Sequence, residues 1–196
     1  MRTDSLAQVL DEIRQCQRCV EHLPCGPRPV VQAGQSSRLC IIGQAPGRKV
    51  HETGIPWDDA SGRRLREWLG LSCETFYDPD KIAIIPMGFC YPGKAASGDN
   101  PPRPECAPLW HDRLKEQLPD IRLTLLIGQY AQAYYLKASR KATLGETVRA
   151  WQDYLPLGCL PLPHPSPRNQ LWIHRNPWFE SDVIPQIQGI IRPIVL

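Results

Sequence analysis

The stretch Leu39-Cys-Ile-Ile-Gly-Gln-Ala-Pro-Gly47 joins a short apolar run to a turn of glycine and proline. Such a run, bounded by a turn, is typical of a strand that is covered on both faces, as in a parallel sheet. Three similar runs follow, at residues 82–85, 123–127 and, with a weaker pattern, 157–160. The sequence therefore predicts four buried strands.

Helical patterns lie between and around these runs. We expect helices over residues 6–16, 61–69, 104–118, 129–136, 143–154 and 178–190. Because strands and helices alternate along the chain, we predict an α/β fold with a four-stranded parallel sheet flanked by helices. We expect residues 1–196 to form a single domain, since this length is typical of one domain.

The composition indicates a soluble globular protein. Of 196 residues, 42% are hydrophobic and 22% charged, which excludes a disordered or fibrous chain, and the 21 prolines predict many rigid loops. No apolar run is long enough to span a membrane, and the amino-terminal residues lack the pattern of a signal peptide. We therefore expect a cytoplasmic protein without a membrane partner. A net charge of +3 permits a nucleic-acid partner without requiring one.

Three loops with polar residues or glycine follow the predicted strands. They are Gly43-Gln-Ala-Pro-Gly47, Pro86-Met-Gly-Phe-Cys90 and His164-Pro-Ser-Pro-Arg-Asn169. The carboxyl ends of parallel strands meet at one edge of a sheet, so we predict the active site there. The first loop alone is equally consistent with a tight connection between a strand and a helix. The last combines an imidazole, a hydroxyl and a guanidinium, groups that suit acid–base chemistry and phosphate binding.

These loops resemble two motifs of the uracil-DNA glycosylase superfamily. The first motif, with Thr53-Gly-Ile-Pro-Trp57 and Ser61-Gly62, resembles that of the family 4 enzymes, and His164-Pro-Ser-Pro-Arg-Asn169 resembles that of the single-strand-selective monofunctional uracil glycosylases. The resemblance extends from about residue 16 to residue 178. It implies a three-layer α/β/α fold and excision of uracil, or of a related deaminated base, from DNA.

The resemblance also implies a metal centre. Cys16, Cys19, Cys90 and Cys106 have a spacing similar to that of the cysteines that hold a structural four-iron, four-sulfur cluster in family 4. The same four residues are also consistent with a zinc ion or with reduced, buried thiols. Of the other cysteines, Cys40 and Cys159 lie in strand patterns and are expected in the core, whereas Cys25 and Cys73 have no evident partner.

In the reaction that the resemblance implies, His164 donates a hydrogen bond to O2 of the leaving base. Trp57 stacks on the flipped base, although a core tryptophan is the alternative, and Gly43 and Ala45 contact the base. We expect the indole of Trp57 and the imidazole of His164 to face each other across one pocket. Since no lysine is placed for a Schiff base, we expect a monofunctional glycosylase.

Two departures from the family pattern concern water and base choice. Family 4 has a glutamate at the position of Gln44, and the single-strand-selective branch has an asparagine at that of Ala45. We therefore expect Gln44 to orient the water, with Glu52, Asp58 and Asp59 as nearby carboxylates that could substitute. The family asparagine at the end of strand two is also missing, so Met87 and Gly88 would contact the base through their main chain, and the excised base stays open.

The remaining expectations concern DNA. Pro165, Ser166, Arg168 and Asn169 are expected to hold phosphate or to wedge the strand. The resemblance implies single- or double-stranded DNA with a damaged base as the partner, a monomer, and a place in the bacterial cytosol or nucleoid. Two other hypotheses remain: an inactive module of the same fold that binds damaged or single-stranded DNA, and an enzyme that acts on a small molecule.

Overall fold

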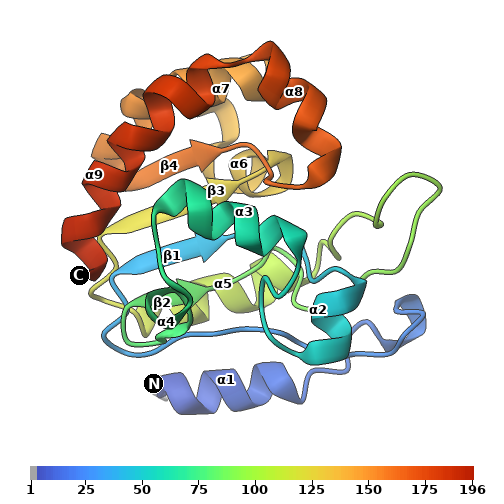
Figure 1. Cartoon of the computed structure of the whole chain (residues 1–196). Helices are drawn as coiled ribbons and strands as arrows, with labels where there is room; N and C mark the ends of the chain where they lie inside the picture. Colours follow the sequence, from blue (N-terminus) through green and yellow to red (C-terminus); the bar gives the residue numbers. More distant parts are fainter. Residues whose placement is uncertain (1–3) are drawn as a thin grey trace.

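A computed structural model describes residues 4–196, and at its centre lies a parallel sheet of four strands (Figure 1). The strands have the order β2-β1-β3-β4, and all neighbouring pairs are parallel. Their bounds are Leu39–Ile42 for β1, Ile82–Ile84 for β2, Leu123–Ile127 for β3 and Cys159–Leu162 for β4. This confirms the predicted α/β fold with a four-stranded parallel sheet.

Side chains of β1 alternate between two hydrophobic cores. Leu39 and Ile41 belong to the core on one face of the sheet, and Cys40 and Ile42 to the core on the other. All four are 3% exposed or less, because helices cover both faces. This alternation explains why the strand is an unbroken apolar run in the sequence.

The helices form two layers, one on each face of the sheet. Residues of α3 (Ala60–Leu69), α4 (Cys73–Tyr77), α7 (Leu144–Arg149), α8 (Gln170–Arg175) and α9 (Ile184–Val195) pack into the first core. Those of α1 (Leu6–Arg14), α5 (Cys106–Glu116) and α6 (Gln129–Leu136) pack into the second. The remaining elements are α2 (Arg48–Thr53), the 3₁₀ turns η1 (Val20–His22), η2 (Lys137–Ser139), η3 (Trp151–Leu157) and η4 (Pro167–Asn169), and the π-helical turn η5 (Phe179–Val183).

Several predicted elements differ in detail from the structure, and the helix predicted over residues 178–190 is a π-helical turn, η5, followed by α9, which continues to Val195. Strand β4 begins at Cys159, two residues later than predicted, because η3 continues to Leu157 and Gly158 then adopts a left-handed conformation with φ of 67°. Pro161 is tolerated within β4 because this strand lies at the edge of the sheet and pairs only with β3. The helix predicted over residues 143–154 ends at Arg149 and is replaced by the 3₁₀ turns of η3.

The carboxyl ends of the strands lie on one side of the molecule. Figure 1 shows the arrowheads of β1, β3 and β4 on the side that also carries α2 and the long loop between β2 and α5. This is the edge at which the sequence predicts the active site. No helix among residues 4–196 has the length and apolar character that crossing a membrane requires.

Candidate active site

A pocket of about 800 Å³ opens at this edge of the sheet. It is lined by the loops that follow β1, β3 and β4, by Pro86 after β2, and by the turn at residues 97–99. Of the residues predicted to act in catalysis, base binding or DNA binding, the structure brings eight to this pocket: Gly43, Gln44, Ala45, Trp57, His164, Ser166, Arg168 and Asn169. Pro165 is buried and does not line it, so its expected contact with DNA is not supported by its position.

His164 follows β4 directly and presents its imidazole to the pocket. Its Nδ1 accepts a hydrogen bond from the backbone N–H of Ser166 at 3.2 Å, so in the neutral ring the proton resides on Nε2. Burial lowers the pKa of His164 from 6.5 to about 4, against a smaller opposing effect of Asp59. Near neutral pH, His164 is therefore an uncharged donor with its N–H at Nε2.

Trp57 is held in an uncommon backbone conformation. Its φ is +57°, in the left-handed region that residues other than glycine rarely adopt. Two glycines make room for it: a Cβ on Gly62 would lie 1.7 Å from the carbonyl oxygen of Trp57, and a Cβ on Gly43 would lie 2.7 Å from its indole. Both motif glycines thus allow the close approach of this one tryptophan, and strain maintained by its surroundings is typical of functional sites.

The rings of Trp57 and His164 are neighbours in the pocket. Their centroids lie 5.6 Å apart with an angle of 34° between the planes. Two aromatic rings in contact have their centroids about 4.5–7 Å apart, so this spacing leaves no room for a base between them. The expectation that these rings face each other across the pocket is therefore corrected: they touch, and a base would have to bind beside the pair.

Met87 and Gly88 do not lie in the pocket, which corrects their expected role in base binding. Their N–H groups donate to the carbonyl oxygens of Gly43 at 2.9 Å and of Gln44 at 3.0 Å, so the main-chain donors are already used. The side chain of Met87 packs in the second core, next to α5. Backbone hydrogen bonds between the segments that follow β1 and β2 thus continue beyond the strands, and the N–H groups of Met87 and Gly88 are not available to a ligand.

Three carboxylates near the first motif have different surroundings. Glu52 is exposed and paired with Arg48 at 3.0 Å, and Asp58 lies 3.7 Å from Lys49. Asp59, in contrast, lines the pocket and raises the pKa of His164, which places its charge near the imidazole. One oxygen of Asp59 caps α3 by accepting the N–H of Gly62 at 2.8 Å, and the other lies 3.8 Å from where a Cβ on Gly47 would stand.

Gln44 is half-buried in the same pocket. Among residues 4–196 its side-chain amide has no hydrogen-bond partner, so both its donor and its acceptor are free for a ligand or a water molecule. Lys49 also lines the pocket, where its side chain is 57% exposed and its ammonium pairs with Asp58. A lysine at the rim was not foreseen from the sequence.

The loop after β4 is fixed by hydrogen bonds of its own. The side-chain amide of Asn169 donates to the carbonyl oxygen of His164 at 2.7 Å, and the hydroxyl of Ser166 accepts the N–H of Arg168 at 3.3 Å. The guanidinium of Arg168 lies against Gly98, where a Cβ would come within 2.3 Å of it. Arg168 is therefore exposed at the pocket mouth, between the loop after β4 and the loop between β2 and α5.

Sequence reasoning missed several lining residues. Gly128, Gln129 and Tyr130 line the pocket just after β3, and Asp99 lines it from the loop between β2 and α5. The glycine that follows the apolar run 123–127 is a signal that could have identified the first three. Asp99 lies in a loop without a motif, so only its three-dimensional position reveals it.

The four cysteines of the expected metal centre surround a second, small cavity. Cys16, Cys19, Cys90 and Cys106 line it together with the apolar side chains of Ile13, Leu23, Phe89 and Trp110. Burial raises the pKa of the Cys90 thiol to about 12, and the neighbouring thiols add to this effect. Within residues 4–196, however, no three side chains of histidine, cysteine, aspartate or glutamate are arranged to hold a metal ion.

Of the other cysteines, the two expected in the core lie there. Cys40 is buried in the second core, and Cys159 is partly buried against it. Cys25 and Cys73 are exposed. The structure thus separates four cysteines around one cavity from four that have no common site.

Comparison with known proteins assigns the chain to a family. The solution NMR structure of a protein from Methanosarcina acetivorans, described as a putative uracil DNA glycosylase, is similar at a TM-score of 0.46 and 15% identity, covering 85% of this chain and 98% of that one. The family model of the uracil DNA glycosylase superfamily matches residues 31–188, which include all the residues that line the pocket except Val30. With four fifths of its length matched, the chain belongs to the uracil DNA glycosylase superfamily.

Proposed function

We propose that this protein is a monofunctional DNA glycosylase that hydrolyses the N-glycosidic bond of uracil, or of a related deaminated base, in DNA. Members of its superfamily are usually N-glycosylases, and membership implies binding of damaged DNA. The observation that carries the proposal is a neutral imidazole in a pocket beside a strained tryptophan, with an Nε2–H that has no partner among residues 4–196. Such a site suits a base that has left the DNA stack.

In the proposed reaction the glycosidic bond breaks with its electron pair on the base. The Nε2–H of His164 donates to O2 of uracil, where negative charge develops. The base stacks on the part of the Trp57 indole that the ring of His164 does not cover. A water molecule adds its oxygen to C1′ of the sugar. Its proton passes to the leaving base, directly or through solvent.

Asp59 is our candidate for the group that holds this water and stabilises the sugar cation. Of the three carboxylates near the first motif, it is the one that lines the pocket. Asp59→Asn keeps a residue that can cap α3 but removes the charge, so we expect single-turnover excision to slow about 100-fold or more. Asp58→Asn is the matched control, since it removes the neighbouring charge at the rim and should have a small effect. Equal losses in both variants would contradict this role.

Excision is tested with a single-stranded oligonucleotide that contains one uracil. The wild-type protein should produce an alkali-sensitive abasic site, and His164→Ala should not, at equal DNA binding. Borohydride should trap no covalent complex, because we propose that Lys49 stays paired with Asp58 at the rim and forms no Schiff base with the sugar. Tight binding without an abasic product would favour a binding module of the same fold, and the absence of binding at low salt would contradict both.

We also propose that the four clustered cysteines hold a structural four-iron, four-sulfur cluster, as in the family 4 enzymes that the first motif resembles. The donor set fits: four thiols from two distant segments surround one cavity with apolar walls. A single zinc ion needs all its sulfurs within about 2.3 Å, whereas each thiolate of a cluster binds a different iron, so its ligands stand farther apart. We propose the cluster and not zinc because the spacing of these four cysteines resembles that of the family 4 enzymes.

Metal analysis of the purified protein tests this proposal. We expect about four irons and four sulfides per chain and a broad absorbance near about 400 nm. Cys90→Ser should lose the iron, and Cys73→Ser, an exposed cysteine outside the cavity, should retain it. One zinc per chain, or no metal after anaerobic purification, would overturn it.

A further inference from the structure

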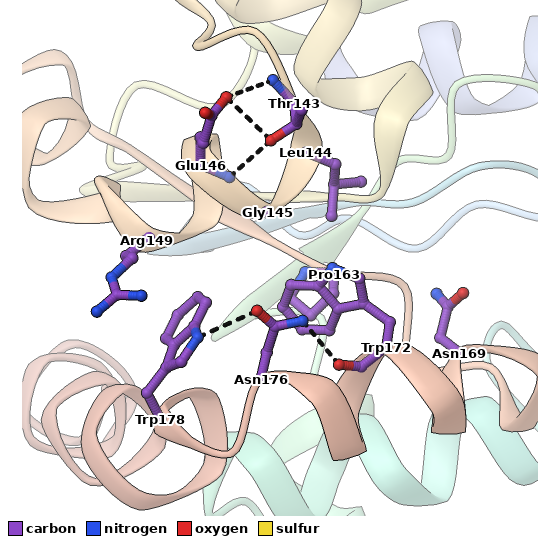
Figure 2. Close-up of a pocket in the computed structure, with 10 residues that line it drawn as sticks. All are labelled: Thr143, Leu144, Gly145, Glu146, Arg149, Pro163, Asn169, Trp172, Asn176 and Trp178. Carbon is purple, nitrogen blue, oxygen red and sulfur yellow. Dashed lines mark hydrogen bonds between the residues drawn. The ribbon is translucent and has the colours of Figure 1, made fainter.

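A second concave site, which we call the tryptophan groove, lies between α7 and α8. It has a volume of about 590 Å³. Figure 2 shows residues of α7 on one side, Trp172 to Trp178 on the opposite side, and Pro163 between them. Its lining residues are Thr143, Leu144, Gly145, Glu146, Arg149, Pro163, Asn169, Trp172, Asn176 and Trp178.

The tryptophan groove is adjacent to the active-site pocket. Leu144 and Asn169 line both. The segment from Pro163 to Asn169 separates the two: Pro163 faces the groove, whereas His164, Ser166 and Arg168 face the pocket. The groove therefore lies where a nucleotide next to a flipped one on the same strand can reach it.

The indole of Trp178 is held by a hydrogen bond, and that of Trp172 by its contact with this ring. The side chain of Asn176 accepts the N–H of Trp178 at 3.1 Å and donates to the carbonyl oxygen of Trp172 at 2.8 Å. The rings meet edge to face, with their centroids 5.9 Å apart. Both side chains are only partly buried, so they offer ring surface that is already ordered before a ligand binds.

The polar groups of the groove suit a nucleotide. The guanidinium of Arg149 lies 5.2 Å from the ring centre of Trp178 and forms no ion pair among residues 4–196, which leaves its charge available for a phosphate. The indole N–H of Trp172 has no partner among the described residues and can donate to a base. The one carboxylate, Glu146, is bound at its own helix start by the N–H and hydroxyl of Thr143.

We infer that the tryptophan groove binds an unpaired nucleoside next to the damaged one on the same DNA strand, by stacking on Trp172 or Trp178 with its phosphate at Arg149. This inference rests on the proposed function, because the pocket and the groove then act on one strand. A base can enter the groove only when it is not paired, so the groove favours single-stranded substrates. Base stacking on an aromatic side chain is sequence-tolerant, so no flanking sequence is selected.

Binding of single strands tests the inference without requiring excision. Fluorescence anisotropy is measured with a labelled oligonucleotide that carries a central 2′-fluoroarabino-uracil, whose glycosidic bond resists hydrolysis. Two further strands have a base-free tetrahydrofuran spacer immediately 5′ or 3′ of that nucleotide. We expect one of the two spacers to weaken binding by the wild-type protein at least about fivefold, which corresponds to the loss of one stacked base.

A variant that fills the groove provides the second measurement. A side chain at Gly145 would begin 3.5 Å from Nε1 of Trp172, so the ring of Gly145→Phe can occupy the groove without a clash at Cβ. It should bind all three strands equally and as weakly as the wild-type protein binds its worse spacer strand. Gly189→Phe makes the same change on the exposed face of α9, where nothing lies within 4 Å, and should behave as the wild-type protein does.

The outcomes are distinct. A wild-type protein that binds the three strands equally, or a Gly145→Phe variant that still distinguishes them, would overturn the groove and leave the glycosylase proposal intact. A wild-type protein that binds none of the strands at low salt would overturn both. Thermal melting of Gly145→Phe near that of Gly189→Phe shows that the comparison concerns binding and not folding.

Discussion

Excision should remain active at pH values where an ordinary histidine is charged. At pH 5.5 a histidine with a pKa of about 4, as expected for His164, is about 97% neutral, whereas one with the usual 6.5 is about 9% neutral. If the neutral Nε2–H donor is the active form, kcat/KM at pH 5.5 should stay within about twofold of its value at pH 8. With an ordinary pKa it would fall about tenfold.

Nuclear magnetic resonance measures this pKa directly. In protein labelled with ¹⁵N at histidine, the ring nitrogens of His164 should show the tautomer with its proton on Nε2 and should titrate near pH 4. The carboxylate of Asp59 raises this pKa and the guanidinium of Arg168 lowers it, so Asp59→Asn should move the midpoint down and Arg168→Gln should move it up. Opposite shifts of the titration midpoint in these two variants identify the resonance as that of His164.

Two results would refute the reasoning. A midpoint near 6.5 would mean that the imidazole is not buried as the structure places it. A rate that rises as the pH falls toward 4 would mean that the charged ring, and not the neutral one, is the donor to the leaving base.

Three further predictions concern the site and its support. Trp57→Ala should raise KM for uracil-containing single strands about 5- to 150-fold through loss of base stacking, and an unchanged KM would contradict a role in base binding. Gly62→Ala would place a Cβ 1.7 Å from the carbonyl oxygen of Trp57 and should lower the free energy of unfolding by about 2 kcal/mol or more in urea titrations, whereas Gly189→Ala, in open space, should not lower it. Burial lowers the pKa of His111 from 6.5 to about 4, so the unfolded chain binds more protons in this range and stability present above pH 6.5 is lost as the pH falls toward 4. Between pH 7 and 4 the wild-type protein should therefore lose up to about 3 kcal/mol more stability than His111→Gln, and equal losses would contradict this.

The sheet could be predicted from the sequence because its strands are apolar on both faces. Strands β1 and β3 have the predicted bounds, and α6 coincides with its predicted helix over residues 129–136. Short helices such as α2 and α8 could not be predicted, because six residues carry too little periodicity and such helices depend on tertiary contacts. The later start of β4 depends on η3, whose 3₁₀ turns continue to Leu157 and which the apolar pattern over residues 157–160 does not reveal.

The motifs predicted which loops form the candidate site but not how each side chain is used. The sequence could not show which of the three carboxylates acts in the pocket. In the structure Asp59 lines the pocket, whereas Asp58 and Glu52 are paired with cations. Nor could the sequence show that Met87 and Gly88 are withdrawn by backbone pairing. The tryptophan groove was also hidden, because its two sides come from segments about 25 residues apart.

The most direct test of the central claim is a crystal structure of the protein with a single strand that contains 2′-fluoroarabino-uracil. We predict that the uracil lies in the pocket at the carboxyl edge of the sheet, stacked against Trp57, with its O2 within about 3.2 Å of Nε2 of His164. A uracil bound elsewhere on the protein, or one in the pocket with its O2 turned away from His164, would contradict the account.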